Sequence, residues 1–187
     1  MPSGVVHVVV RFMSGRGTRG RRIAVPVAVA LLAVTVLRIQ PPLLPAYLYF
    51  VLAAVVLAVI DVESRRLPNA IVLPSYVVVA VLLTASSLWR HDFWPLARAG
   101  IGGAVLFVFF TVLATANPDG MGFGDVKLAG LIGLVLGYLS WSALLFGSFA
   151  GFLLGGVAGL ALIRRGRDTV IPYGPFLIAG ALLGILV

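Results

Sequence analysis

The sequence contains no cysteine, and its two histidines, His7 and His91, lie far apart. Without cysteine, the protein can form no disulfide bond, thiol nucleophile, iron–sulfur cluster or cysteine-held zinc site. The separation of the two histidines also argues against a histidine-rich metal site. We therefore expect chemistry that needs no metal and no other cofactor.

Charged residues are scarce as well. They make up 11% of the 187 residues, while hydrophobic residues make up 61%, and a soluble domain carries roughly 25% charged residues. This composition nearly excludes a soluble globular fold. Lys and Arg outnumber Asp and Glu by 14 to 6, for a net charge of +8. With so little water-facing surface, we expect this excess to set membrane topology and not to bind nucleic acid.

Apolar runs fill most of the remaining chain, and one membrane crossing uses about 20 apolar residues. They occupy residues 23–39, 43–60, 70–88, 99–116, 128–163 and 171–187. Continuous runs are typical of helices, whereas barrel strands would be short and alternating. The run at 128–163 is too long for one crossing, so we divide it near residues 140–142. The sequence predicts an all-α polytopic membrane protein with about six or seven transmembrane helices.

A basic tail precedes the first apolar run. The tail and this run could form a secretory signal, but the run has 17 residues, and the core of a signal has about 7 to 15. A start at Met13 instead of Met1 is another open alternative at this end. We predict two parts, a basic tail at residues 1–22 and a single transmembrane domain at residues 23–187.

The Lys and Arg residues predict the orientation of the chain. If the tail is inside, the inner segments hold eleven of the fourteen, and the outer segments hold Arg38, Arg90 and Arg98. Cytoplasmic loops carry an excess of Lys and Arg, so the N-terminus is expected in the cytoplasm. If residues 128–163 formed one crossing, the bias would shrink to eight against six, which also favours dividing this run.

The six acids are few enough to be placed individually. Asp92 lies on the predicted outer side. The other five lie at the predicted inner boundary: Asp61, Glu63, Asp119, Asp125 and Asp168. Acidic residues do not follow the positive-inside rule, so this clustering needs another explanation.

Asp61 and Asp125 stand out by their context. Asp61 directly follows the apolar run 43–60, and the next helix is expected to begin at residues 68–69. Asp125 lies in the glycine-rich segment GMGFGDVKL, residues 120–128, and glycines let a backbone approach a partner or ligand closely. The simpler alternatives are a charged stop at the membrane surface for Asp61, and a helix N-cap or small-residue packing around Asp125.

Two acids at the boundaries of separate helices, on the same membrane face, are suited to form a carboxylate dyad. In such a pair, proximity makes one carboxyl keep its proton while the other ionises. The ionised group can take a proton from water, and the protonated group can polarise a peptide carbonyl and then protonate the leaving amine. The pair would titrate as a unit. Such a pair meets the requirement for peptide hydrolysis by activated water.

Three motifs occur in order along the chain: Asp61 with residues 68–69, the segment 120–128, and IPYGPFL at residues 171–177. Together they resemble the type IV prepilin peptidases, intramembrane aspartic proteases of the GxGD class, and the resemblance extends over about residues 43–187. It implies that Asp61 and Asp125 are the catalytic pair. It also implies a set of residues that shape the site or bind substrate: Pro68, Asn69, Gly122, Gly124, Lys127, Pro172, Tyr173, Gly174 and Pro175.

The resemblance also implies a substrate and a location. That family removes the basic leader of prepilins and pseudopilins at the cytoplasmic face of the inner or plasma membrane, and related archaeal enzymes process preflagellins. Its larger members add a region with paired CxxC motifs and methylate the new N-terminus. This chain has no cysteine, and only residues 40–42 separate the first two predicted crossings. We therefore expect a peptidase without methyltransferase activity, similar to the short forms that serve tight-adherence pili, with the prepilin or pseudopilin and membrane lipid as partners.

Some of these residues have simpler interpretations. Lys127 is two positions from Asp125 and would point elsewhere on a helix, so we expect an interfacial anchor, with tuning of the dyad as the alternative. Pro172, Gly174 and Pro175 are expected to break the start of the last helix and leave backbone groups for an extended substrate. A simple turn is the alternative for this segment.

Two other classes of function compete with the peptidase. Ionisable residues in membrane helices often mark ion or proton paths, so an ion- or proton-coupled transporter is one rival. A noncatalytic assembly scaffold is the other. The acids lie at helix boundaries and not at mid-helix, and no repeated half is visible in the sequence, which favours the peptidase.

Overall fold

The structure of the protein is a computed structural model that describes residues 33–64, 67–116, 121–164 and 173–187, apart from the side chains of residues 161–164. The regular secondary structure of this part is all helical, which confirms the all-α prediction. Residues 33–38 are helical, and the following helices are η1 (Pro41–Leu43), α3 (Leu44–Ser64), α4 (Asn69–Arg90), α5 (Trp94–Ala116), α6 (Phe123–Leu139), α7 (Trp141–Arg164) and α8 (Gly174–Leu186). The predicted tail and most of the first predicted crossing lie outside the described residues.

Four helical segments are long and apolar enough to cross a membrane: Pro41–Ser64, Asn69–Arg90, Trp94–Ala116 and Trp141–Leu160. α6 and α8 have 17 and 13 residues, fewer than the roughly 20 of a full crossing. α6 nevertheless packs against α4, α5, α7 and α8, and twelve of its residues are buried. The protein is therefore an all-α polytopic membrane protein with a short helix at its centre.

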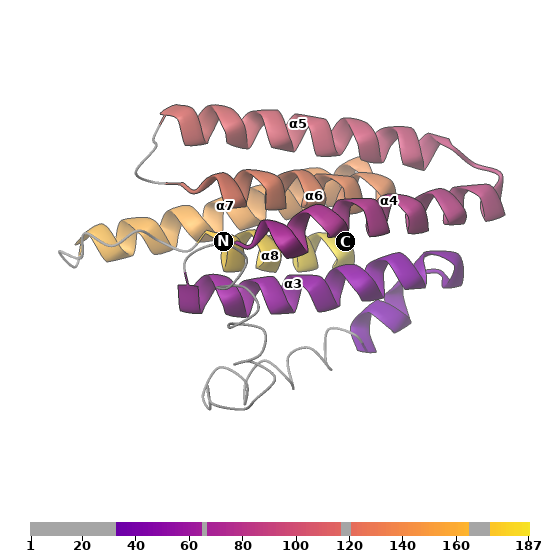
Figure 1. Cartoon of the computed structure of the whole chain (residues 1–187), viewed down its shortest axis with the longest axis horizontal. Helices are drawn as coiled ribbons and strands as arrows, with labels where there is room; N and C mark the ends of the chain where they lie inside the picture. Colours follow the sequence, from indigo (N-terminus) through magenta and orange to yellow (C-terminus); the bar gives the residue numbers. More distant parts are fainter. Residues whose placement is uncertain (1–32, 65–66, 117–120, 165–172) are drawn as a thin grey trace.

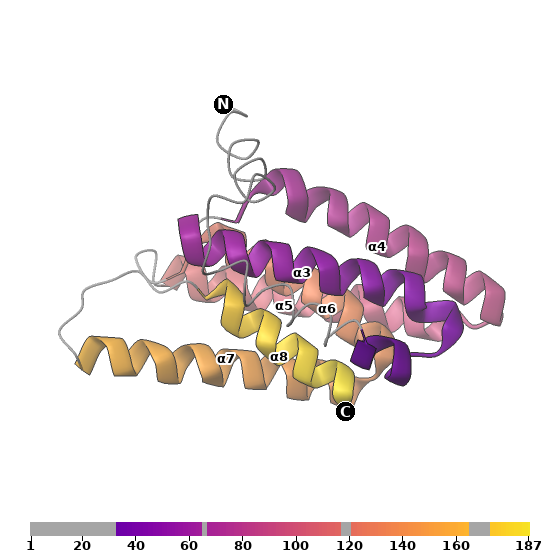
Figure 2. The same ribbon diagram turned by 90° about the horizontal axis from the view of Figure 1, so that it is seen from below.

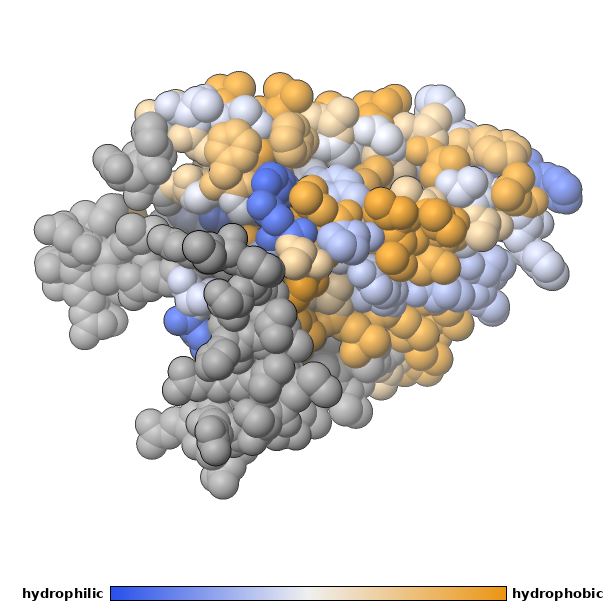
Figure 3. Space-filling model, viewed as in Figure 1, coloured by the Kyte–Doolittle hydropathy of each residue, from blue (hydrophilic) through white to orange (hydrophobic). Residues whose placement is uncertain are grey.

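The outside of the bundle is apolar. Figure 3 shows many hydrophobic residues, in orange, among paler ones on the coloured part of one face. Large apolar side chains of α4 and α5 are more than half exposed, among them Val77, Val81, Val105 and Val108. An apolar surface of this extent is unfavourable in water but suits contact with lipid chains.

The predicted division of the run 128–163 is confirmed, because α6 ends at Leu139 and α7 begins at Trp141. Ser140 between them has an extended backbone (φ −167°, ψ 164°), and its hydroxyl accepts the N–H of Ala143 at 2.9 Å. The last carbonyl groups of a helix lack partners within the helix. Here Arg98 of α5 donates hydrogen bonds of 2.6, 2.6 and 2.7 Å to the carbonyl oxygens of Gly137, Tyr138 and Leu139.

The chain connections bring several helix ends to one end of the bundle. In Figure 1, α3 ends and α4, α6 and α8 begin toward the left of the molecule. Figure 2 shows α8 lying between α3 and α7, and α8 packs against both. Residues at the end of α3 and at the starts of α6 and α8 can therefore contribute to one site.

α5 and α6 are in backbone contact through glycines. A Cβ added to Gly133 of α6 would lie 2.8 Å from the carbonyl carbon of Gly102 and 2.8 Å from the Cα of Gly103, both on α5. Contacts between small residues let membrane helices approach closely. This contact helps to set the position of α6, and with it the position of Asp125 at its start.

We predict that Gly133→Ala lowers the free energy of unfolding by about 1–3 kcal/mol, because the added methyl group overlaps the α5 backbone. Gly100→Ala is the matched control, since an added Cβ at Gly100 of α5 would have no atom within 4 Å. Thermal unfolding in detergent micelles measures both variants. A Gly133→Ala protein as stable as Gly100→Ala would contradict the backbone contact.

Candidate active site

Asp61 lies in the last turn of α3, and its side chain faces the interior of the bundle. It is only 3% exposed. Its Oδ2 accepts the backbone N–H of Gly174, in the first turn of α8, at 3.1 Å. A buried carboxylate without such a donor would be costly. The structure thus pairs Asp61 with a residue 113 positions away.

Asp125 lies in the first turn of α6 and is 7% exposed. The helix begins at Phe123, with Gly122 at the N-cap, so the alternative that Asp125 itself caps the helix is wrong. Its Oδ1 is buried and has no hydrogen-bond partner among the residues that the structure describes. An unpaired buried oxygen is uncommon in proteins and calls for an explanation.

The two acids line the same pocket, which has a volume of about 290 Å³. Its other lining residues are Leu67, Asn69, Gly122, Phe123, Gly124 and Lys127. Asp125 lies outside the four candidate spans. Burial raises the pKa of its carboxyl to about 7, and the nearby Asp61 contributes further to the rise. The pair can therefore hold a proton near neutral pH, as a carboxylate dyad requires.

Lys127 lines this pocket, but its ammonium group bonds to the start of α4. Its Nζ donates a hydrogen bond of 2.9 Å to Oδ1 of Asn69. Pro68, the N-cap of α4, is buried beside Asn69, so α4 begins where the sequence predicted. The Tyr76 hydroxyl of α4 donates to the backbone oxygen of Lys127 at 2.6 Å. Lys127 and its partners thus join the starts of α4 and α6 at the rim of the pocket.

The predicted break at the start of the last helix is wrong in part. Tyr173 is the N-cap of α8, and Gly174 and Pro175 form its first turn. A proline is tolerated there, because the first N–H groups of a helix have no intrahelical partner. The N–H of Gly174 bonds to Asp61 and is not free for a substrate. Pro172 lies outside the described residues.

The ring of Tyr173 does not line the pocket. It packs against α7, where a Cβ added to Gly155 would lie 2.6 Å from the ring.

Of the remaining acids, Glu63 is exposed, and Asp92 accepts the N–H of Trp94 at 3.1 Å beside the start of α5. Asp119 and Asp168 lie outside the described residues. Within the described part of the chain, no group of three or more His, Asp or Glu could hold a metal ion.

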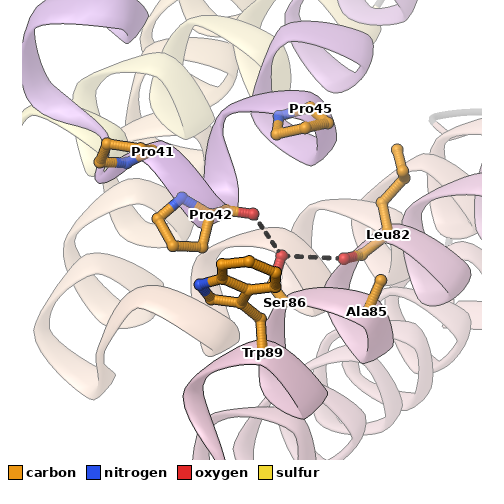
Figure 4. A pocket seen from close by; sticks show the side chains of 7 residues that line it. All are labelled: Pro41, Pro42, Pro45, Leu82, Ala85, Ser86 and Trp89. Carbon is orange, nitrogen blue, oxygen red and sulfur yellow. Dashed lines mark hydrogen bonds between the residues drawn. The ribbon is translucent and has the colours of Figure 1, made fainter.

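A second pocket lies at the opposite end of α3 and α4 (Figure 4). It has a volume of about 380 Å³ and is lined by Pro41, Pro42, Pro45, Leu82, Ala85, Ser86 and Trp89. The Ser86 hydroxyl donates a hydrogen bond of 2.6 Å to the carbonyl oxygen of Pro42, so its one donor is used within the fold. The lining contains no acid, so this pocket offers no general acid or base for hydrolysis.

The glycine at position 124 has a specific steric role. A Cβ added there would lie 2.9 Å from the Cβ of Leu67, in the connection between α3 and α4. A Cβ added to Gly122 would lie 3.6 Å from Oδ2 of Asp125, which is an ordinary van der Waals distance. Only Gly124 is therefore needed for the close approach of α6 to the segment that follows Asp61.

We predict that Gly124→Ala lowers the free energy of unfolding by about 1–3 kcal/mol, because the new methyl group presses against Leu67. Gly122→Ala, two residues earlier, should change it by less than about 0.5 kcal/mol. Chemical unfolding in mixed micelles compares the two variants with the unmodified protein. Equal losses for both substitutions would show that steric contact at residue 124 is not the cause.

Fold and site together define a polytopic helical membrane protein with two buried aspartates, from different helices, in one pocket. A sequence model of the type IV leader peptidase family matches residues 48–160, a segment that contains both Asp61 and Asp125. This match covers more than half of the chain, and the chain belongs to the type IV leader peptidase family.

Two curated relatives illustrate the similarity. The prepilin leader peptidase/N-methyltransferase of Bacillus subtilis (strain 168) is 33% identical over 141 residues, which are 73% of this chain and 53% of the relative. The protein of the same name from Pseudomonas putida is 30% identical over 138 residues, covering 70% and 45%. The chain thus spans about half the length of the curated relatives it matches. No solved structure matches the chain.

Proposed function

We propose that this protein is an aspartic endopeptidase that removes the leader peptide of prepilins or pseudopilins. The main support is the placement of Asp61 and Asp125, two buried acids from separate helices that line one pocket. Membership of the type IV leader peptidase family supports the same reaction, and the relatives' names supply the class of substrate.

The dyad supplies what hydrolysis of a peptide bond needs. One carboxylate takes a proton from a water molecule as the water oxygen attacks the carbonyl carbon of the scissile bond. The other carboxyl, which holds a proton, hydrogen-bonds to the carbonyl oxygen and stabilises the charge that develops there. A proton then passes to the nitrogen of the leaving amine, and the carbon–nitrogen bond breaks. The products are two peptides, and the dyad returns to its singly protonated state.

The pocket faces the cytoplasm in this proposal. It lies at the end of the bundle where α3 ends and α6 begins, and the counts of Lys and Arg favour an inner position for these connections. An anionic inner leaflet would attract the same positive charges. The enzyme therefore sits in the cell membrane, surrounded by lipid, and meets the leader on its cytoplasmic side. The absence of methyltransferase activity remains a prediction.

We predict that Asp61→Asn and Asp125→Asn each reduce leader cleavage by at least about 100-fold, because each removes one partner in proton transfer. Asp92→Asn is the matched control. Asp92 lies beside the start of α5, far from the pocket in the fold, and Asn also caps helices well. Immunoblots of cells that coexpress a tagged prepilin measure the mature fraction.

Wild-type trimming by either pocket variant would disprove the dyad. The rival transporter would instead show proton or solute flux in proteoliposomes and leave the prepilin uncut.

We also predict that cleavage slows as the pH rises through about 7, because a carboxyl with the raised pKa of Asp125 loses its proton there. Loss of this proton leaves the dyad with no acid for the carbonyl and the leaving amine. Initial rates in proteoliposomes between about pH 5 and pH 9 test this dependence. Unfolding measured at each pH separates titration of the site from loss of the fold. Rates that stay constant or increase above pH 7 would contradict the prediction.

A further inference from the structure

We propose that Gly174 is a positioning residue whose backbone N–H holds Asp61 as the ionised, water-activating member of the dyad and leaves Asp125 as the protonated member. This inference rests on the proposed peptidase function and assigns the two roles within it.

The first support is the hydrogen bond from Gly174 to Asp61. The N–H groups of the first turn of a helix have no intrahelical partner and carry a partial positive charge. The N–H groups of Phe176 and Leu177 bond to the carbonyl oxygen of Tyr173, and Pro175 has no N–H. The N–H of Gly174 points instead to Oδ2 of Asp61 at 3.1 Å. A hydrogen bond from such a donor favours the charged form of a carboxylate.

The second support is the different environment of Asp125. Its buried Oδ1 has no hydrogen-bond partner among the described residues. The backbone N–H of Asp125 bonds to the carbonyl oxygen of Gly122, within the first turn of α6. A proton on the Asp125 carboxyl would give this group a donor, which could bond to the carbonyl oxygen of a substrate. The surroundings of Asp61 thus favour its ionised form and those of Asp125 favour its protonated form, as the reaction requires.

The third support is the absence of a side chain at position 174. A Cβ there would lie 2.7 Å from Oδ2 and 3.1 Å from Cγ of Asp61. The carboxylate would have to move away, and the N–H that it accepts would be lost or lengthened. Close approach of the α8 backbone to Asp61 therefore requires glycine at this position.

Among the residues that the structure describes, few other charged groups face the pair. In the pocket, Lys127 of α6 is the other charged residue, and its ammonium group bonds to Asn69 of α4. On α8, the N-cap residue Tyr173 packs against Gly155 of α7. On α3, Glu63 is exposed. Asp61 accepts the N–H of Gly174 in a hydrogen bond of 3.1 Å. The N–H of Gly122 acts on the Asp125 carboxyl in the same sense, but burial and the nearby Asp61 raise the pKa of Asp125 by more than this contact lowers it.

Infrared spectroscopy tests the assignment without relying on cleavage. At about pH 6, exposed carboxyls are ionised, and the purified protein should show the carbonyl stretch of one protonated carboxyl. We expect this band to disappear in Asp125→Asn and to remain in Asp61→Asn. A band that persists in Asp125→Asn, or that vanishes in Asp61→Asn, overturns the assignment. Because the readout needs no substrate, it can fail while the peptidase function holds, and the reverse is also true.

Kinetics of Gly174→Ala test the positioning role. We expect the added methyl group to displace Asp61 and lower kcat by at least about tenfold, with KM changed less than about twofold. Gly156→Ala on α7 is the control, since an added Cβ there has no atom within 4 Å and the residue does not line the pocket. Ala favours helix over Gly, so neither substitution weakens helix formation as such.

Thermal unfolding of both alanine variants shows whether each is folded. A folded Gly174→Ala protein with the kcat of Gly156→Ala overturns the proposal. For an unfolded Gly174→Ala protein, the infrared comparison of the two Asn variants decides it.

Discussion

Burial of two carboxylates inside an apolar helical bundle is the constraint on which this structure depends. A buried charge is unfavourable unless donors or a proton compensate it, and the interior of a membrane helix offers few free donors because its N–H groups are already bonded. The starts of helices are the exception. Asp61 lies against the start of α8, and Asp125 lies in the start of α6. The site is therefore at one end of the bundle.

The position of Asp125 depends on how the protein holds α6, which is too short to be placed by the membrane alone. Hydroxyl groups from two neighbouring helices donate to its backbone, Tyr47 of α3 to Val135 at 2.7 Å and Tyr76 of α4 to Lys127 at 2.6 Å. Arg98 of α5 bonds to its last carbonyl groups. With the glycine contact to α5, these bonds fix α6 along its length, so that its first turn presents Asp125 to the pocket.

Much of the fold could be predicted from the sequence, since long apolar runs and the division at Ser140 follow from lengths and composition alone. The Asp61 and Asp125 pair followed from helix boundaries and charge counts. The bonds of Arg98 to the end of α6 could not be predicted, because a lone arginine near a predicted outer loop is expected only to set membrane topology. The hydrogen bond from Gly174 to Asp61 joins residues 113 positions apart. The pattern of residues within one segment cannot predict a contact between segments so distant in the sequence. The apolar run predicts a helix from residue 128, but α6 begins five residues earlier, at Phe123, because Gly124 and Asp125 lie within the helix.

The candidate site also extends beyond the segment of the chain that the family model matches. The matched segment ends at residue 160 and contains both acids, whereas the N–H that contacts Asp61 comes from residue 174. α8 packs along α7 and also contacts α3 and α6. Contacts with three helices therefore position its start beside the pocket. Two aspartates in the right order are thus only part of the candidate site. The structure adds a third helix, whose start makes the surroundings of two chemically identical acids unequal.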